Sequence, residues 1–232
     1  IFKARRRMGA VVETPSIYLD MTAEENLKEQ CRILGMPSFD GIAEILQLVG
    51  LEDTGKKKAK NFSLGMRQRL GIAVALTGNP DFLVLDEPIN GLDPQGIIDV
   101  RELILKLNRE RGITVLVSSH ILDELSKIAT HFGFIDKGKI VKEMSAEQLA
   151  NACSKRIEIT VSDTKILSRV LDGLNIEYSV KSDTEAEIFG EIDFTELTLK
   201  LHGEHCDVKA MCEHSESLEA FYIDLLGGKS NE

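Results

Sequence analysis

The stretch FLVLDEP at residues 82–88 decides the fold of this chain. The segment Asp81–Leu85 is too apolar for a strand that faces water at a sheet edge, so we expect a strand of a parallel sheet buried on both faces. A helix over about Gly96–Glu110, a second buried strand at Ile113–Val117 and a helix over about Ile121–Ala129 follow it. This strand, helix, strand, helix order predicts a βαβ sheet.

A helical section, about residues 14–78, precedes that strand. Ala23–Leu34 and Asp40–Val49 carry apolar residues at helical spacing. The segment Leu64–Leu76 is a third predicted helix, with Ser63 at the N-cap position. A glycine, an asparagine and a proline directly after it are typical of a helix end.

A second, smaller domain follows the βαβ section. Phe132–Asp136 and Lys139–Glu143 form a predicted hairpin, and the helix Ala146–Ala152 leads to a domain boundary near Cys153. Beyond it we expect strand 156–161, helix 164–174, strands 177–181 and 185–190, helix 194–202, strand 207–211 and helix 217–226. The first six of these elements have the order of a ferredoxin-like unit. The sequence therefore predicts an α/β domain, 1–152, and a small α+β domain, 153–232.

Composition excludes several classes of protein. The chain has 232 residues, 43% of them apolar, which is enough for one large core or two smaller ones. Its apolar runs are far shorter than the roughly 20 residues that cross a bilayer, so any membrane role is expected to be peripheral. A formal charge of −10 argues against a nucleic-acid surface, because phosphate contacts need clustered Lys and Arg.

The cysteines favour reduced thiols in a cytosolic setting, because they lack the spacing of a disulfide framework. They are Cys31, Cys153, Cys206 and Cys212. The last two lie among histidines, but the stretch has no recognised zinc spacing and is interpreted as a helix end followed by a strand.

Two places in the chain carry residues suited to phosphate chemistry. Asp86, at the carboxyl end of a buried strand, can hold Mg²⁺ through water, because a hard cation prefers oxygen ligands. Glu87 follows it and can accept a proton from an attacking water, although the two carboxylates could instead cap the next turn. Ser63 and Gly65 open a helix, where free N–H groups and a glycine suit a phosphate.

Four sequence pieces in order resemble the ABC ATPase family over about the first 150 residues. They are NFSLGMRQRLG at 61–71, FLVLDEP at 82–88, NGLDP at 90–94 and His120 after a strand. The resemblance implies an ABC ATPase core of the P-loop NTPase type, with ATP and Mg²⁺ as its cofactors.

The resemblance also implies roles for these residues. Asp86 matches the Walker B carboxylate, Glu87 the catalytic base, and His120 the switch histidine beside the γ-phosphate. Asp93 is expected at the contact between two subunits. The signature residues Ser63 and Gly65 complete the partner's ATP pocket, so hydrolysis implies a dimer, expected to be a homodimer.

Two departures from the family pattern narrow the resemblance. The signature has Leu64 and Met66 where the family usually has glycine and glutamine. Glu13 occupies the position that is usually a glutamine facing the metal; a carboxylate only accepts hydrogen bonds, so we expect it to bind Mg²⁺ more strongly. A solvated surface glutamate is the alternative. The pattern is similar to the bacitracin-resistance and lantibiotic-immunity ATPases, which implies export of antimicrobial peptides.

No Gly-x-x-x-x-Gly-Lys-Ser/Thr occurs in the sequence, so we expect this phosphate-binding loop, Walker A, to lie upstream of Ile1. We therefore expect the chain as given to bind ATP weakly and to be inactive alone. The expected partners are a second copy and separate transmembrane permease subunits that carry the peptide, which places the protein on the cytoplasmic face of the membrane. The alternatives are a soluble ABC ATPase that acts on ribosomes or DNA, and a catalytically silent remnant.

Overall fold

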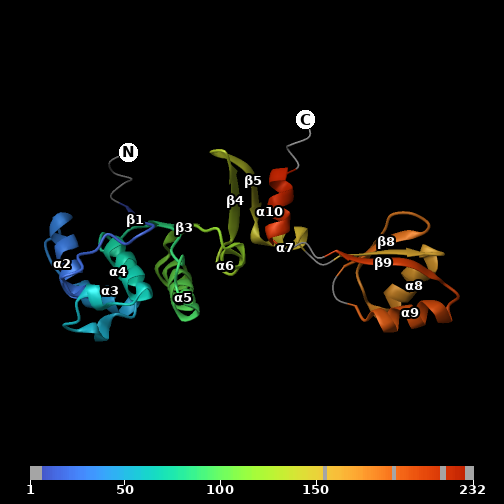
Figure 1. Cartoon of the computed structure of the whole chain (residues 1–232), viewed down its shortest axis with the longest axis horizontal. Coiled ribbons are helices and arrows are strands. Elements are labelled where there is room, and N and C mark those ends of the chain that lie inside the picture. The colour runs from blue at the N-terminus through green and yellow to red at the C-terminus, as the bar shows by residue number, and fades with distance from the viewer. Residues whose placement is uncertain (1–6, 154–155, 190–191, 215–217, 228–232) are drawn as a thin grey trace. The chain divides into compact units, whose positions relative to one another are not determined.

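The chain folds into two compact units. The computed structural model describes residues 7–153, 156–189, 192–214 and 218–227. One unit ends at Ile128 and the other begins at Ala129. Figure 1 labels the helices and strands of the chain. Each unit has its own hydrophobic core. The domain boundary near Cys153 stays a prediction.

Among residues 7–128, three parallel strands form one sheet. They are β1 (Met8–Val12), β2 (Phe82–Asp86) and β3 (Thr114–Ser118), hydrogen-bonded in that order. Val12 lies opposite Asp86, and Asp86 lies opposite Ser118. The carboxyl ends of all three strands therefore meet at one edge. The parallel pairing of β2 with β3 confirms the predicted βαβ order, whereas β1 is a strand that sequence reasoning missed.

The expectation of a second buried strand at Ile113–Val117 is wrong, because strand β3 is not buried. In β2, Leu83 and Leu85 are fully buried and alternate with half-buried residues. Strand β3 alternates between exposed and half-buried residues, and Leu116 is 56% exposed. The physical reason is that only one face of β3 packs against the core, through Val115 and Val117. Thr114, Leu116 and Ser118 alternate with them and are exposed on the other face.

Five α-helices accompany this sheet in the described part of the first unit. They are α2 (Ala23–Ile33), α3 (Ile42–Leu48), α4 (Leu64–Leu76), α5 (Pro94–Arg111) and α6 (Leu122–Ser126). The predicted helices are confirmed, and α4 matches its predicted bounds. Helix α6 is shorter than expected and ends three residues before Ala129.

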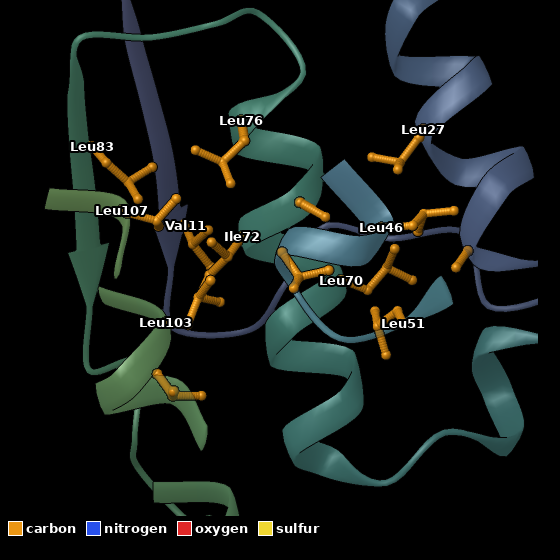
Figure 2. Packing of buried hydrophobic residues seen from close by; sticks show 14 of the residues in the cluster. Val11, Leu27, Leu46, Leu51, Leu70, Ile72, Leu76, Leu83, Leu103 and Leu107 are labelled. Carbon is orange, nitrogen blue, oxygen red and sulfur yellow. The ribbon is translucent and has the colours of Figure 1, made fainter. Parts of the chain in front are cut away.

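Helix α4 lies at the centre of this unit, which explains why it is apolar on more than one side. Figure 2 shows Ile72 pointing toward Val11 of the sheet, whereas Leu70 points toward Leu46 and Leu51. Leu70 and Ile72 are completely buried. The same helix therefore packs against the sheet and against the helical section.

The second unit combines a hairpin with a four-stranded sheet. The hairpin is β4 (His131–Asp136) and β5 (Lys139–Ser145), followed by α7 (Ala146–Ala152). The last helix, α10 (Leu218–Gly227), returns to it, with the rings of Phe134 and Phe221 5.8 Å apart between centroids.

The remaining elements confirm the ferredoxin-like order. They are β6 (Arg156–Val161), α8 (Thr164–Leu174), β7 (Tyr178–Val180), β8 (Glu185–Phe189), α9 (Phe194–Gly203) and β9 (Val208–His214). The strands form one antiparallel sheet in the order β7-β8-β6-β9. Gly190 and Ser217, at the expected ends of a strand and a helix, lie outside the described residues.

Within the described ranges, none of the helices combines the length and the apolar character needed to cross a bilayer.

Candidate functional site

Ser118 ties together the two carboxylates that follow β2. Its hydroxyl donates to Asp86 Oδ1 at 2.5 Å and accepts from the backbone N–H of Glu87 at 3.0 Å. Sequence reasoning missed this residue. The available signal was the polar run of residues 118–120 directly after an apolar strand, at the register where a parallel neighbour would meet Asp86. Ser118 therefore fixes Asp86 at the end of the strand and Glu87 at the start of the next turn.

Glu87 and His120 form a direct contact. The Nδ1 atom of His120 lies 2.9 Å from Glu87 Oε2. The Glu87 side chain is 25% exposed and that of His120 is 65% exposed, so the pair is open to a ligand on the His120 side. Glu87 has a φ of 47°, a left-handed backbone that turns it away from the direction of β2. The structure thus brings the predicted base and the predicted switch histidine together.

Glu13 lies at the same edge of the sheet. It directly follows β1, is exposed, and has a left-handed φ of 48°. Because Val12 pairs with Asp86, Glu13 and Asp86 stand at the ends of neighbouring strands.

The predicted metal residues, Asp86 and Glu13, fit a magnesium ion that is delivered with a nucleotide. In the part of the chain that the structure describes, no three His, Cys, Asp or Glu side chains gather closely enough to form a metal cage. Proteins commonly hold Mg²⁺ with one or two carboxylates together with phosphate oxygens and water. Two carboxylates at neighbouring strand ends match that arrangement and do not match an all-protein site.

Ser63, Gly65 and Asp93 lie where two helices begin. The Ser63 hydroxyl accepts from the backbone N–H of Met66 at 3.2 Å and caps α4, as predicted. Asp93 caps α5 in the same way, with its Oδ1 atom 3.1 Å from the Gly96 nitrogen.

Packing within the fold does not explain the glycine at position 65. A Cβ atom at this position would have its nearest neighbour, the Cα of Gly96, at 3.6 Å, an ordinary contact. The described fold therefore does not require a glycine here. The absence of a side chain leaves room for a group from outside to approach the N-terminus of α4.

The segment from Glu13 to Thr22 is fastened to the helices by two contacts. A Cβ on Gly71 of α4 would lie 2.5 Å from the Pro15 Cβ, so the glycine is needed for the segment to cross this helix closely. Asn26, only 2% exposed, accepts from the Tyr18 nitrogen at 2.7 Å. It also donates to the Tyr18 oxygen at 3.0 Å and to the Thr22 oxygen at 2.8 Å. Neither role was predicted from the sequence.

Comparisons with known proteins agree with this arrangement. The pattern of the ABC transporter family matches residues 2–90. The chain is 39% identical over 226 residues to the bacitracin transport ATP-binding protein BcrA of Bacillus licheniformis, covering 96% of this chain and 74% of the relative. It is 46% identical over 138 residues to the lantibiotic transport ATP-binding protein SrtF of Streptococcus pyogenes, covering 60% of this chain and 59% of that protein.

A solved structure shares the fold. It is a dimer of an ATP-binding cassette in a post-hydrolysis state with ADP and Pi, and it matches with a TM-score of 0.54 and 28% identity. The match covers 62% of this chain and 66% of that one. Together with the sequence relatives, it carries the conclusion that this chain belongs to the family of ABC transporter ATP-binding proteins.

Proposed function

We propose that this chain, joined to the phosphate-binding loop expected upstream of it, binds and hydrolyses ATP as the motor subunit of a transporter that exports antimicrobial peptides of the bacitracin or lantibiotic type. The proposal of ATP hydrolysis rests on a group of hydrogen-bonded side chains at the ends of β2 and β3. In it, Ser118 bonds Asp86 and Glu87, and Glu87 bonds His120. A metal residue, a base and a γ-phosphate sensor are thereby held in one network.

Each residue has a distinct task in this proposal. Asp86 and Glu13 would hold Mg²⁺, which when bound would offset the charge on the phosphate oxygens. Glu87 accepts a proton from the water that attacks the γ-phosphorus. His120 keeps the Glu87 carboxylate in place through its Nδ1 contact and presents its exposed ring edge to the phosphate.

The helix N-termini are proposed to serve a second copy of the chain. Ser63 and Gly65 expose the first turn of α4, where N–H groups and the helix dipole favour an anion. Asp93 caps α5 beside that turn, because a Cβ added to Gly65 would lie 3.6 Å from the Cα of Gly96 in the first turn of α5. A homodimer would then place these residues against the nucleotide of the partner, with Asp93 at the contact between the two copies.

The proposed site of action is the cytoplasmic face of the membrane, on separate permease subunits. Support comes from the names of the relatives BcrA and SrtF, which are transport ATP-binding proteins for bacitracin and for a lantibiotic. Glu13 also supports this assignment, because the sequence around it is similar to that of the bacitracin-resistance and lantibiotic-immunity ATPases.

The catalytic proposal is tested with Glu87→Gln in the full-length protein that carries the phosphate-binding loop. The amide keeps the shape but cannot take the proton, so we expect phosphate release to fall by about 10² to 10⁴-fold while ATP binding remains. Asp183→Asn, on an exposed loop of the second unit, is the control and should leave the rate unchanged. An unchanged rate in Glu87→Gln would exclude Glu87 as the base, whereas no hydrolysis in the parent protein would favour a catalytically silent chain.

The transport proposal needs a separate measurement. Co-expression with its permease in a sensitive bacterium should raise the inhibitory concentration of bacitracin or of a lantibiotic, and Glu87→Gln should abolish this protection. Active hydrolysis without protection against either peptide would overturn the peptide assignment and favour the soluble ATPase alternative.

A further inference from the structure

Helix α6, directly after His120, is held by few contacts of its own. It has five residues, none of them buried, and Ile121 at its N-cap position provides no side-chain cap. The neighbouring Ile121 and Ile128 are only partly buried against the core. The segment that carries the exposed His120 ring therefore needs another attachment to stay in one position.

An ion pair provides that attachment. Arg101 Nη1 lies 3.0 Å from Glu124 Oε2, joining α5 to α6. The two side chains are 24% and 18% exposed, which makes this a half-buried pair. The other carboxylate oxygen, Oε1, receives Lys127 Nζ at 2.5 Å. Hydrogen bonds and charge from Lys127 and Arg101 lower the pKa of Glu124, so this carboxylate is ionised at neutral pH.

The arginine stands on a rigid support. Helix α5 has 18 residues, begins at the Asp93 cap, and buries four large residues on its core face: Val100, Leu103, Ile104 and Leu107. Arg101 is therefore fixed relative to the sheet, and Glu124, in α6, follows His120 by four residues. A shift of α6 would change the distance between His120 Nδ1 and Glu87 Oε2.

We propose that Arg101 is a positioning residue for catalysis, which acts through Glu124 on α6 and thereby holds His120 against Glu87. This inference rests on the proposed function, because it assumes that His120 and Glu87 act in ATP hydrolysis. It adds a residue outside the family motifs. It also links the helix that begins at the subunit contact, at Asp93, to the switch histidine.

The test compares Arg101→Ala with Arg109→Ala, an exposed arginine on the same helix, in the full-length protein. We expect Arg101→Ala to lower kcat for ATP hydrolysis about tenfold with KM within twofold, because a displacement of about 1 Å in a catalytic group can cost up to 10²-fold. Arg101→Lys should recover part of the rate, and Arg109→Ala should have none of these effects. An unchanged kcat in Arg101→Ala would overturn the proposal.

Epistasis with His120 separates positioning from a general structural role. In a His120→Ala background, Arg101→Ala should not lower kcat further, because the group that it positions is gone. An equal loss in both backgrounds would overturn the proposal. The proposed function fails by a different result, namely hydrolysis that survives Glu87→Gln.

Hydrogen exchange gives a readout that is independent of activity. Amides of residues 119–126 should exchange faster in Arg101→Ala than in Arg109→Ala, while the amides of α4 remain unchanged. The double variant Arg101→Glu/Glu124→Arg should restore slow exchange and part of kcat. Faster exchange throughout the first unit would show that the pair only supports the fold.

Discussion

The contact between Gly71 and Pro15 leads to a quantitative prediction for Gly71→Ala. The added Cβ would lie 2.5 Å from the Pro15 Cβ and 3.0 Å from its Cγ, whereas carbon atoms pack at about 3.5–4.0 Å. The segment or the helix must therefore move by about 1 Å. Overpacking of this kind costs about 1–3 kcal/mol, against a gain of up to about 1 kcal/mol from helix propensity. We expect a net loss of about 1–2 kcal/mol.

Hydrogen exchange of the buried α4 amides measures this loss locally, without assuming that both units unfold together. Gly173→Ala in α8 is the matched control, because a Cβ there meets nothing within 4 Å and should stabilise its helix. In a Pro15→Gly background, the cost of Gly71→Ala should largely disappear. Slower exchange in Gly71→Ala, or the same cost in both backgrounds, would refute the reasoning.

Three further predictions test the cap, the buried amide and an ion pair. Ser63→Ala should destabilise α4 by about 1 kcal/mol, and Ser63→Gly by only about a few tenths, as measured by exchange of its first-turn amides. Asn26→Leu leaves the Tyr18 N–H without its partner and removes one of the two hydrogen bonds to the Tyr18 oxygen, which Met21 N–H also donates to. It should cost about 1–3 kcal/mol, seen as faster exchange of the Tyr18 amide. A hydrogen bond to Glu187 raises the pKa of Lys181. The Lys181–Glu187 ion pair therefore stabilises the fold fully below the ordinary lysine pKa, and this stabilisation is lost as the pH rises through the raised pKa of Lys181. Alkaline denaturation should show a smaller loss in Lys181→Met than in the parent over that range, and equal losses would contradict the ion pair.

Local signals explain which elements were predictable from sequence. The sequence predicts the bounds of helix α4, Leu64–Leu76, because a serine cap and a glycine after the helix act within a few residues of its ends. Strand β1 was missed because five residues that alternate between exposed and buried carry little local signal, and only pairing with β2 defines it. The exposure of Leu116 depends on which strands and helices cover β3, which a run of apolar residues does not specify.

The sequence predicts which residues form the candidate site but not the hydrogen bonds that join them. Asp86, Glu87 and His120 follow apolar strands in a recognised order, so their identities were available. The Ser118 bridge and the Glu87–His120 contact depend on the register of two strands that are far apart in sequence. The role of Asn26 depends on a loop folding back on its own helix, and polar residues at helical spacing do not reveal this.

The left-handed backbones of Glu13 and Glu87 imply a trade-off between activity and stability. Glycine and asparagine adopt such angles more readily than glutamate, and an unfavourable backbone region costs of order 1–3 kcal/mol. Selection for stability alone would favour a smaller residue at both positions. Glu13→Gly and Glu87→Gly would then trade a carboxylate for a relaxed turn, and random mutagenesis screened only for heat resistance should enrich them. In laboratory evolution without selection for ATP hydrolysis, the carboxylates that follow β1 and β2 would thus be among the first functional groups to be lost.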